Sequence, residues 1–222
     1  MKKLKFPAEL CYLVGILLLA FGAVLMTKAD LGVSMVIAPA FLLYLKLSAT
    51  WSFITFGIAE YMTQAFVLLL LIIVLKKFRW YYLFSFVTAF FYGLVLDLLM
   101  KLPISCDTMS ARIIVFILSV FACTLGVAFI FHTYIAPEVY ELFIKELSLK
   151  FGWKISRVKT CYDCSSCLIA MLMSFAFFGL FHFEGVKFGT VICALVSGKL
   201  VGIFGTQIDH FLDVTPIFQK QI

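Results

Sequence analysis

Residues 8–26 read AELCYLVGILLLAFGAVLM, and this apolar run decides the fold class. A helix needs about 20 apolar residues, each rising 1.5 Å, to cross a hydrocarbon core about 30 Å thick. Comparable runs recur along the chain. They predict an all-α integral membrane protein with six transmembrane helices, at residues 8–26, 51–75, 81–100, 113–131, 161–181 and 188–204.

The composition supports a membrane protein. Hydrophobic residues make up 64% of the chain, charged residues 14%, and the mean hydropathy is +1.11, values far more apolar than those of a soluble domain. The net charge of +6 comes from short basic clusters between apolar runs, where they set topology. We therefore expect a lipid bilayer as partner and no nucleic acid. The first run is longer than the apolar part of a signal peptide, so we interpret it as a retained helix.

The distribution of Lys and Arg predicts which side of the membrane holds the termini. Residues 34–45 are apolar but contain Pro39 and, at about 12 residues, are too short to cross the bilayer. If they do not cross, twelve basic residues lie on one side and five on the other. Cytoplasmic loops carry the excess of basic residues, so we expect both termini in the cytoplasm. The twelve are Lys2, Lys3, Lys5, Lys76, Lys77, Arg79, Lys145, Lys150, Lys154, Arg157, Lys159 and Lys220.

The two halves of the chain, residues 1–105 and 106–222, have the same order of segments. Each has a span, a short Pro-containing helix and two more spans. We expect the short helices at residues 34–45 and 138–148. Because three crossings is an odd number, the second half must enter the membrane from the opposite side. We therefore predict one membrane domain made of two inverted three-helix repeats, each with a short interrupted or re-entrant helix.

Local sequence similarity favours this duplication. Residues 18–25, LLAFGAVL, align with residues 122–129, ACTLGVAF, and each segment leads to an Ala-Pro pair. These pairs are Ala38-Pro39 and Ala136-Pro137. Inverted repeats with short, Pro-interrupted helices are a known plan of secondary transporters, in which half-helix ends bind substrate or ions near the midplane.

Residues 28–34, KADLGVS, carry a family resemblance. They resemble the signature of the bacterial YczE-like (YitT-related) membrane proteins, in which a span ends in Ala-Asp-Leu-Gly-x-Ser-Pro. The pair Gly189-Thr190 is similar to the start of that family's final span. Met35 stands where the family has Pro, and Ala136 stands where a Gly is expected. The resemblance implies this architecture and a bacterial cytoplasmic membrane, and it implies no activity.

Four charged residues within the predicted spans are candidates for a binding site: Glu60, Asp97, Asp163 and Lys199. A charged side chain at the bilayer centre costs about 2.5 to 3.5 kcal/mol on insertion scales, so each needs a partner or a cavity. Glu60 lies deepest, with Gln64 one turn later, and Asp97 lies near the end of the third span. We expect Lys199 to pair with Glu60 or Asp97, either as a structural salt bridge or as an anion site or proton-coupled switch. Asp163 is interpreted as an acid at the start of the fifth span.

The turn at residues 30–34 is the most distinctive local feature. Gly32 permits a tight turn, and Asp30 or Ser34 can cap the following short helix. If that helix enters the membrane, its N-terminal N–H groups form an anion or carboxylate site. Glu138 and Glu141 occupy the first turn of the matching helix and would repel an anion there. The predicted substrate-binding set is Asp30, Gly32, Ser34, Glu60, Gln64, Asp97 and Lys199.

The sequence does not favour an enzyme. It contains no P-loop, no dinucleotide fingerprint and no grouping typical of nucleophilic catalysis. The spacing Cys161-x-x-Cys164-x-x-Cys167 rotates about 60° around a helix at each step, so these thiols do not converge on one metal ion. We predict no catalytic residue, no metal and no cofactor.

Two functions stay open at this stage. The first is a small-solute secondary transporter or permease of the cytoplasmic membrane. The alternative is a non-transporting membrane accessory or assembly protein, with buried structural charges and a basic cytoplasmic face that includes residues 138–159. A homodimer is compatible with either function, and the sequence does not identify the solute.

Overall fold

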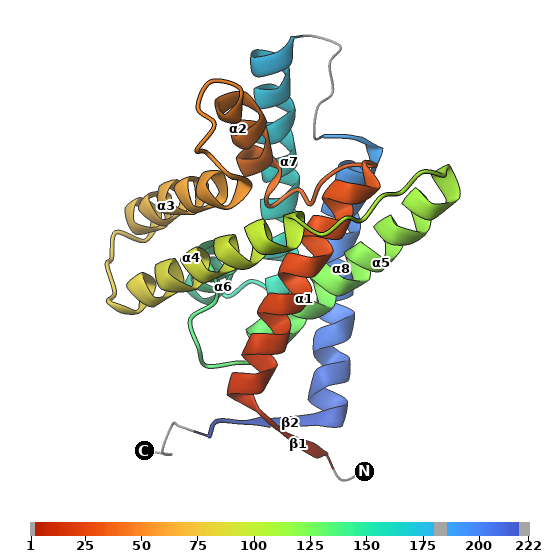
Figure 1. The fold of residues 1–222 in the computed structure, drawn as a ribbon. Coiled ribbons are helices and arrows are strands. Elements are labelled where there is room, and N and C mark those ends of the chain that lie inside the picture. The colour runs from red at the N-terminus through yellow and green to blue at the C-terminus, as the bar shows by residue number, and fades with distance from the viewer. Residues whose placement is uncertain (1–2, 180–185, 218–222) are drawn as a thin grey trace.

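The computed structural model describes residues 3–179 and 186–217 (Figure 1). Within them, six helices are long and apolar enough to cross a membrane. They are α1 (Ala8–Ala29), α3 (Phe56–Leu75), α4 (Tyr81–Met100), α5 (Met109–Phe131), α7 (Ile155–Phe178) and α8 (Phe188–Phe211). Two shorter helices follow α1 and α5, and these are α2 (Ala38–Ser48) and α6 (Val139–Phe151). The prediction of a mainly helical chain with six helices of spanning length is confirmed.

The two largest differences in boundaries are the end of α8, at Phe211 although the hydropathy predicted residue 204, and the start of α7. α7 begins at Ile155 although the hydropathy predicted a start at residue 161. Arg157 and Lys159 lower the hydropathy of the first turns. These turns are nevertheless helical, and Val158 and Lys159 are buried within the protein. A hydropathy average over a window of residues does not detect that a charged residue is buried and compensated within the fold. The predicted end at residue 181 lies outside the described residues.

Helices α1 and α5 have the most extensive contact of the helix pairs in the described chain. A Cβ atom at Gly126 of α5 would lie 2.7 Å from the carbonyl oxygen of Gly15 in α1. One at Gly22 would lie 2.8 Å from the carbonyl oxygen of Ser119. The two backbones are therefore in direct contact, which small residues permit in membrane helices.

The remaining helices pack around this pair. α3 packs against α4, and α7 packs against α8, while α1 also contacts α4 and α5 also contacts α8. Each short helix contacts one long helix from each half of the chain. α2 packs on α3 and α7, and α6 packs on α7 and α3. Figure 1 shows the α3–α4 pair extending to one side of α1, with α2 beside α7.

Two short strands join the ends of the described chain. β1 (Leu4–Pro7) pairs in parallel with β2 (Leu212–Thr215), with Leu4 opposite Leu212. The sequence pattern predicts no strands, because each segment is short and its partner lies at the other end of the chain. The pairing places both ends side by side at the same end of the molecule (Figure 1), as an even number of crossings requires.

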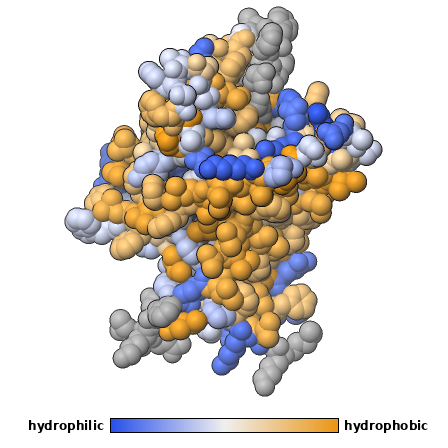
Figure 2. Space-filling view, in the orientation of Figure 1, coloured by the Kyte–Doolittle hydropathy of each residue, from blue (hydrophilic) through white to orange (hydrophobic). Residues whose placement is uncertain are grey.

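The hydrophobicity of the surface is that expected of a protein surrounded by an apolar medium. Figure 2 shows a broad hydrophobic band across the middle of this face, with hydrophilic residues gathered above and below it. Large side chains such as Phe66, Phe84 and Leu172 are at least 60% exposed. Soluble proteins rarely expose continuous apolar surface of this extent. The described chain is therefore that of a multi-pass membrane protein.

Candidate functional site

The segment before α6 enters the interior of the helix bundle. The carbonyl oxygen of Ala136 accepts hydrogen bonds from the Tyr12 hydroxyl at 3.2 Å and the Thr88 hydroxyl at 3.1 Å. The backbone N–H of Val139 donates to Gln64 Oε1 at 2.9 Å. Thr88 and Gln64 lie in the middle of α4 and α3. α6 therefore begins level with the middle of two spanning helices, and its first N–H is satisfied by a side chain from the other half.

Two buried carboxylates share the Gln64 amide. Gln64 Nε2 donates to Glu138 Oε2 at 3.0 Å and to Glu60 Oε1 at 3.3 Å. The neighbouring Tyr140 hydroxyl also interacts with Glu60. Among the described residues, neither Glu60 Oε2 nor this hydroxyl has a hydrogen bond of full geometry. Buried polar atoms are nearly always paired, so this is the least satisfied part of the group. The pKa of Glu138 is well above its ordinary value, first because the carboxyl is buried and then because Glu60 and Glu141 add like charge.

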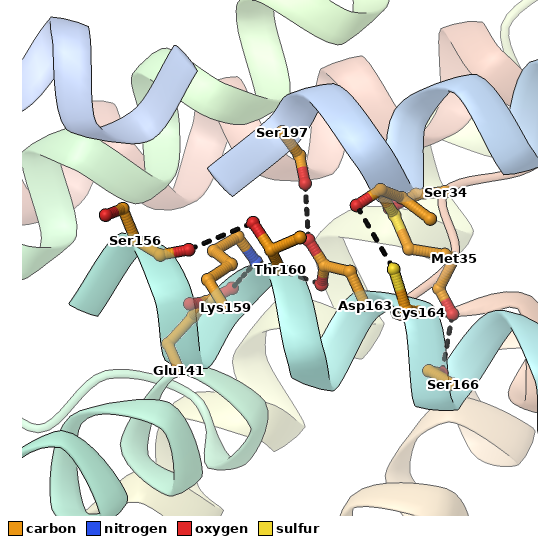
Figure 3. A network of polar contacts seen from close by, with 11 residues as sticks. Ser34, Met35, Glu141, Ser156, Lys159, Thr160, Asp163, Cys164, Ser166 and Ser197 are labelled. Carbon is orange, nitrogen blue, oxygen red and sulfur yellow. Dashed lines mark hydrogen bonds and ion pairs between the residues drawn. The ribbon is translucent and has the colours of Figure 1, made fainter. Parts of the chain in front are cut away.

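A second group of charges continues from this pair. Lys159 Nζ lies 3.2 Å from Glu141 Oε1 and 3.5 Å from Asp163 Oδ1. The Ser197 hydroxyl donates to the other carboxylate oxygen of Asp163. Figure 3 shows Lys159 and Asp163 on α7 between Glu141 of α6 and Ser197 of α8. The contacts link three helices, and the Lys159 side chain is only 3% exposed.

We give the name central cluster to Glu60, Gln64, Glu138, Glu141, Lys159, Asp163 and Ser197. A cavity of about 30 Å³ adjoins this cluster. Its walls include the buried side chains of Tyr92, Cys123 and Cys193, together with residues 34–37 from the segment before α2. The volume suits one or two water-sized species. The segments that precede both short helices therefore meet at one cavity. All residues of the central cluster except Glu60 and Gln64 line the cavity.

The cluster has an excess of negative charge. In the part of the chain that the structure describes, it contains four carboxylates and one ammonium group. Four negative charges and one positive charge sum to −3 if every group is ionised. Isolated buried charges are very unfavourable, so the cluster must hold protons or an added cation.

The family of unknown function DUF6198 matches residues 6–206. The chain belongs to this family. The match includes all seven residues of the central cluster. The match gives no support for the YczE-like assignment that residues 28–34 suggested. Neither the curated proteins nor the solved structures contain a match to the chain.

Only some of the predicted substrate-binding residues of this DUF6198 protein lie close together in the structure. Glu60 and Gln64 belong to the central cluster, and Ser34 lines the adjoining cavity. Asp30 lies elsewhere, exposed at the surface. Its carboxylate pairs with Lys187 at 2.5 Å and Arg112 at 3.4 Å. Asp30 therefore ties the turn after α1 to α5 and to the start of α8.

Gly32 and Asp97 have packing roles in the structure. Gly32 has a φ of +130°, and a Cβ there would lie 2.6 Å from Thr190 Oγ1 of α8. The turn therefore requires glycine, as expected. Asp97 of α4 accepts hydrogen bonds from the Gly57 N–H at 2.8 Å and the Thr55 hydroxyl at 2.6 Å. It secures the N-terminus of α3 and does not line the cavity.

The predicted pairing of Lys199 with Glu60 or Asp97 is wrong. Lys199 is exposed on α8 and forms no ion pair with any described carboxylate. The reason is helical geometry, because Ser197 faces Asp163 and a residue two positions later points about 200° away. Lys159 is the buried lysine instead.

Five cluster residues were not in the predicted set, and one of them is Ser197. Lys159 was counted among the cytoplasmic basic residues, and Asp163 was interpreted as an acid at a helix start. Glu138 and Glu141 were assigned to a cytoplasmic stretch. The i, i+4 spacing of Lys159 and Asp163 was the signal that could have indicated an ion pair on one helix face. Their partner Glu141 lies on another helix, which local spacing does not reveal.

Proposed function

We propose that this protein is a small-solute secondary transporter of the bacterial cytoplasmic membrane, with the central cluster as its binding site. The observation that carries the proposal is the buried, acid-rich cavity where the segments before both short helices meet. Ionisable residues inside membrane proteins are expensive and typically mark solute or ion pathways. The cluster lies between helices from both halves of the chain, which is where transporters with repeats place their sites.

The helix packing supports two related repeats, α1–α4 and α5–α8. α3 contacts α6 while α7 contacts α2, and α1 contacts α4 while α5 contacts α8. Two copies related by a two-fold axis would produce this reciprocal pattern. Close approaches recur as well, because Gly57 meets Gly93 between α3 and α4, and Gly198 meets Thr160 between α7 and α8. We therefore favour an inverted repeat.

The depth of both short helices supports a re-entrant arrangement. Val139, at the start of α6, binds Gln64 in the middle of α3. In the other half, the Met35 carbonyl oxygen accepts a hydrogen bond at 2.7 Å from Ser166 in the middle of α7. Irregular backbone at such depth is tolerated only where protein or a cavity satisfies it. Both segments meet this condition.

The charge distribution supports cytoplasmic termini. Lys159 leaves the count of cytoplasmic basic residues because it is buried. Eleven residues then face five, and the excess still lies on the side of the termini. We retain this orientation in the proposal.

The accessory function is the second candidate, and the paired state of Lys159 favours it. An ion pair between α6 and α7 would hold the fold together without binding any solute. The two functions differ in one respect, because only a transporter must expose the cavity to water.

The proposal is tested by uptake into proteoliposomes. Purified protein is reconstituted, and uptake of radiolabelled amines, amino acids, sugars and organic acids is measured one by one. We expect at least one solute to enter above the level of empty liposomes. Entry is lost in Glu138→Gln and retained in Asp107→Asn, which changes an exposed carboxylate that does not line the cavity. Equal uptake by E138Q and the wild type, or no uptake of any solute, would overturn the proposal.

A further inference from the structure

The Lys159 ammonium group occupies the central cluster as an internal cation. It is buried, and both of its ion-pair partners, Glu141 and Asp163, line the cavity. The lysine is tethered to α7, whereas Glu141 belongs to α6. The cluster is thus already built to hold one compact positive charge between two helices.

The cluster contains more acceptors than this lysine satisfies. Among the described residues, Glu141 Oε2 has no hydrogen-bond partner, and Asp163 Oδ1 has only the ion pair with Lys159. Glu60 has no hydrogen bond of full geometry at Oε2 and interacts with the Tyr140 hydroxyl. All three carboxylates are at most 1% exposed. Buried acceptors without donors favour a ligand that is positively charged or donates hydrogen bonds.

The size and donor set of the cavity restrict that ligand. In this conformation a volume of about 30 Å³ suits a species the size of one or two waters. A ligand held by the closed cavity is therefore smaller than the organic solutes whose uptake is tested above. The described residues contain no group of three or more His, Cys, Asp or Glu arranged to hold a metal ion. A divalent cation, which needs six or more oxygen ligands, is therefore poorly matched. A monovalent ion that keeps part of its water fits better.

Resting on the proposed function, we infer that the central cluster binds a small monovalent cation at Glu141 and Asp163, in competition with the Lys159 ammonium group. An arriving cation takes over the carboxylate oxygens and repels Lys159. Displacement of the lysine breaks its ion pair to Glu141 and loosens α6 from α7. Cation binding is thereby coupled to the packing of a short helix against a spanning helix.

The test is thermal unfolding of the purified wild-type protein in detergent. Chlorides of Na⁺, K⁺ and NH₄⁺ are compared with choline chloride at constant pH and ionic strength. We expect at least one small cation to raise the melting temperature in a saturable manner. Equal melting temperatures in all four salts would overturn the inference, and this comparison needs no variant.

Two variants sharpen the test. Glu141→Gln should lose the cation-dependent shift. Lys159→Gln should lower the cation concentration that gives the half-maximal shift by about 5-fold or more, because the competitor is gone. Lys101→Gln, which changes an exposed lysine, is the matched control and should leave the shift unchanged. A shift in E141Q equal to that of the wild type would contradict the assigned ligands.

The inference and the proposed function fail separately. Cation-dependent stabilisation without uptake of any solute would leave a cation site in a protein that does not transport. Uptake that requires Glu138, without stabilisation by any of the three cations, would leave a transporter whose cluster does not bind them.

Discussion

Gln64 and Glu138 join the two halves of the protein through one hydrogen bond, 3.0 Å from Nε2 to Oε2. The other end of the same amide accepts the Val139 N–H at 2.9 Å. A single neutral side chain from α3 thus satisfies both a carboxylate and the first backbone donor of α6. The start of α6 is held in the bundle interior by this amide.

Replacing Gln64 by Leu should destabilise the protein. The Glu138 carboxylate and the Val139 N–H would lose their partner, and each unsatisfied buried group costs about 1–3 kcal/mol. Denaturant titration in detergent micelles measures the loss. Gln207→Leu, at an exposed position of α8, is the control. Equal stability of the two variants would show that the Gln64 contacts do not hold α6.

Replacing Lys159 by Met should have a larger effect. Removing one partner of a buried ion pair leaves uncompensated charge and costs about 3–5 kcal/mol. The triple variant Lys159→Met, Glu141→Gln, Asp163→Asn should recover most of the lost stability, because both ion-pair partners of Lys159 are then neutral. The exposed Lys199→Met should change stability little. If denaturant titrations give K159M and K199M the same free energy of unfolding, the buried ion pair is refuted.

Stability should rise on acidification through Glu138. Burial and the like charges of Glu60 and Glu141 raise its pKa well above 4.5, against the opposing effects of Gln64 and Lys159. A raised pKa means that the folded state binds the proton more tightly than the unfolded state. This contribution is fully present below pH 4.5 and is lost as the pH rises through the raised value. Melting temperatures should therefore fall from pH 5 to pH 8, and E138Q should flatten the slope. An unchanged slope would assign the pH dependence to other groups.

Gly126→Ala should disrupt the contact between α1 and α5. The added Cβ would lie 2.7 Å from the Gly15 carbonyl oxygen and 2.8 Å from the Leu19 nitrogen, and backbone atoms cannot turn away as side chains can. Overpacking of this kind costs about 1–3 kcal/mol or more. Gly205→Ala meets only His132 at 3.4 Å and should be tolerated. Yield and monodispersity in size-exclusion chromatography compare the two. Equal behaviour would mean that the helix pair can separate without loss.

Hydropathy predicted the spanning helices because the bilayer imposes a length of about 20 apolar residues. Glu60 and Gln64 were found for a related reason, since an acid deep in an apolar run needs a partner. Lys159 was missed because its partner Glu141 is on another helix and its basic neighbours suggested a cytoplasmic loop. Lys199 was misassigned because hydropathy says how deep a residue lies and not which way it faces. The pairing of β1 with β2 depends on residues 208 positions apart, Leu4 and Leu212, which no local pattern encodes.

Cys193 offers the most direct test of the transporter proposal, because its thiol lines the cavity and is 1% exposed. The other six cysteines are replaced by Ser, and the variant is treated with a cationic, membrane-impermeant thiol reagent. Asp107→Cys in the same background is the exposed control. A transporter must open its site to each side in turn, so we predict that Cys193 is labelled in intact cells and also in inside-out vesicles. No labelling of Cys193 from either side, while the added cysteine at position 107 reacts fully in intact cells, would contradict the account.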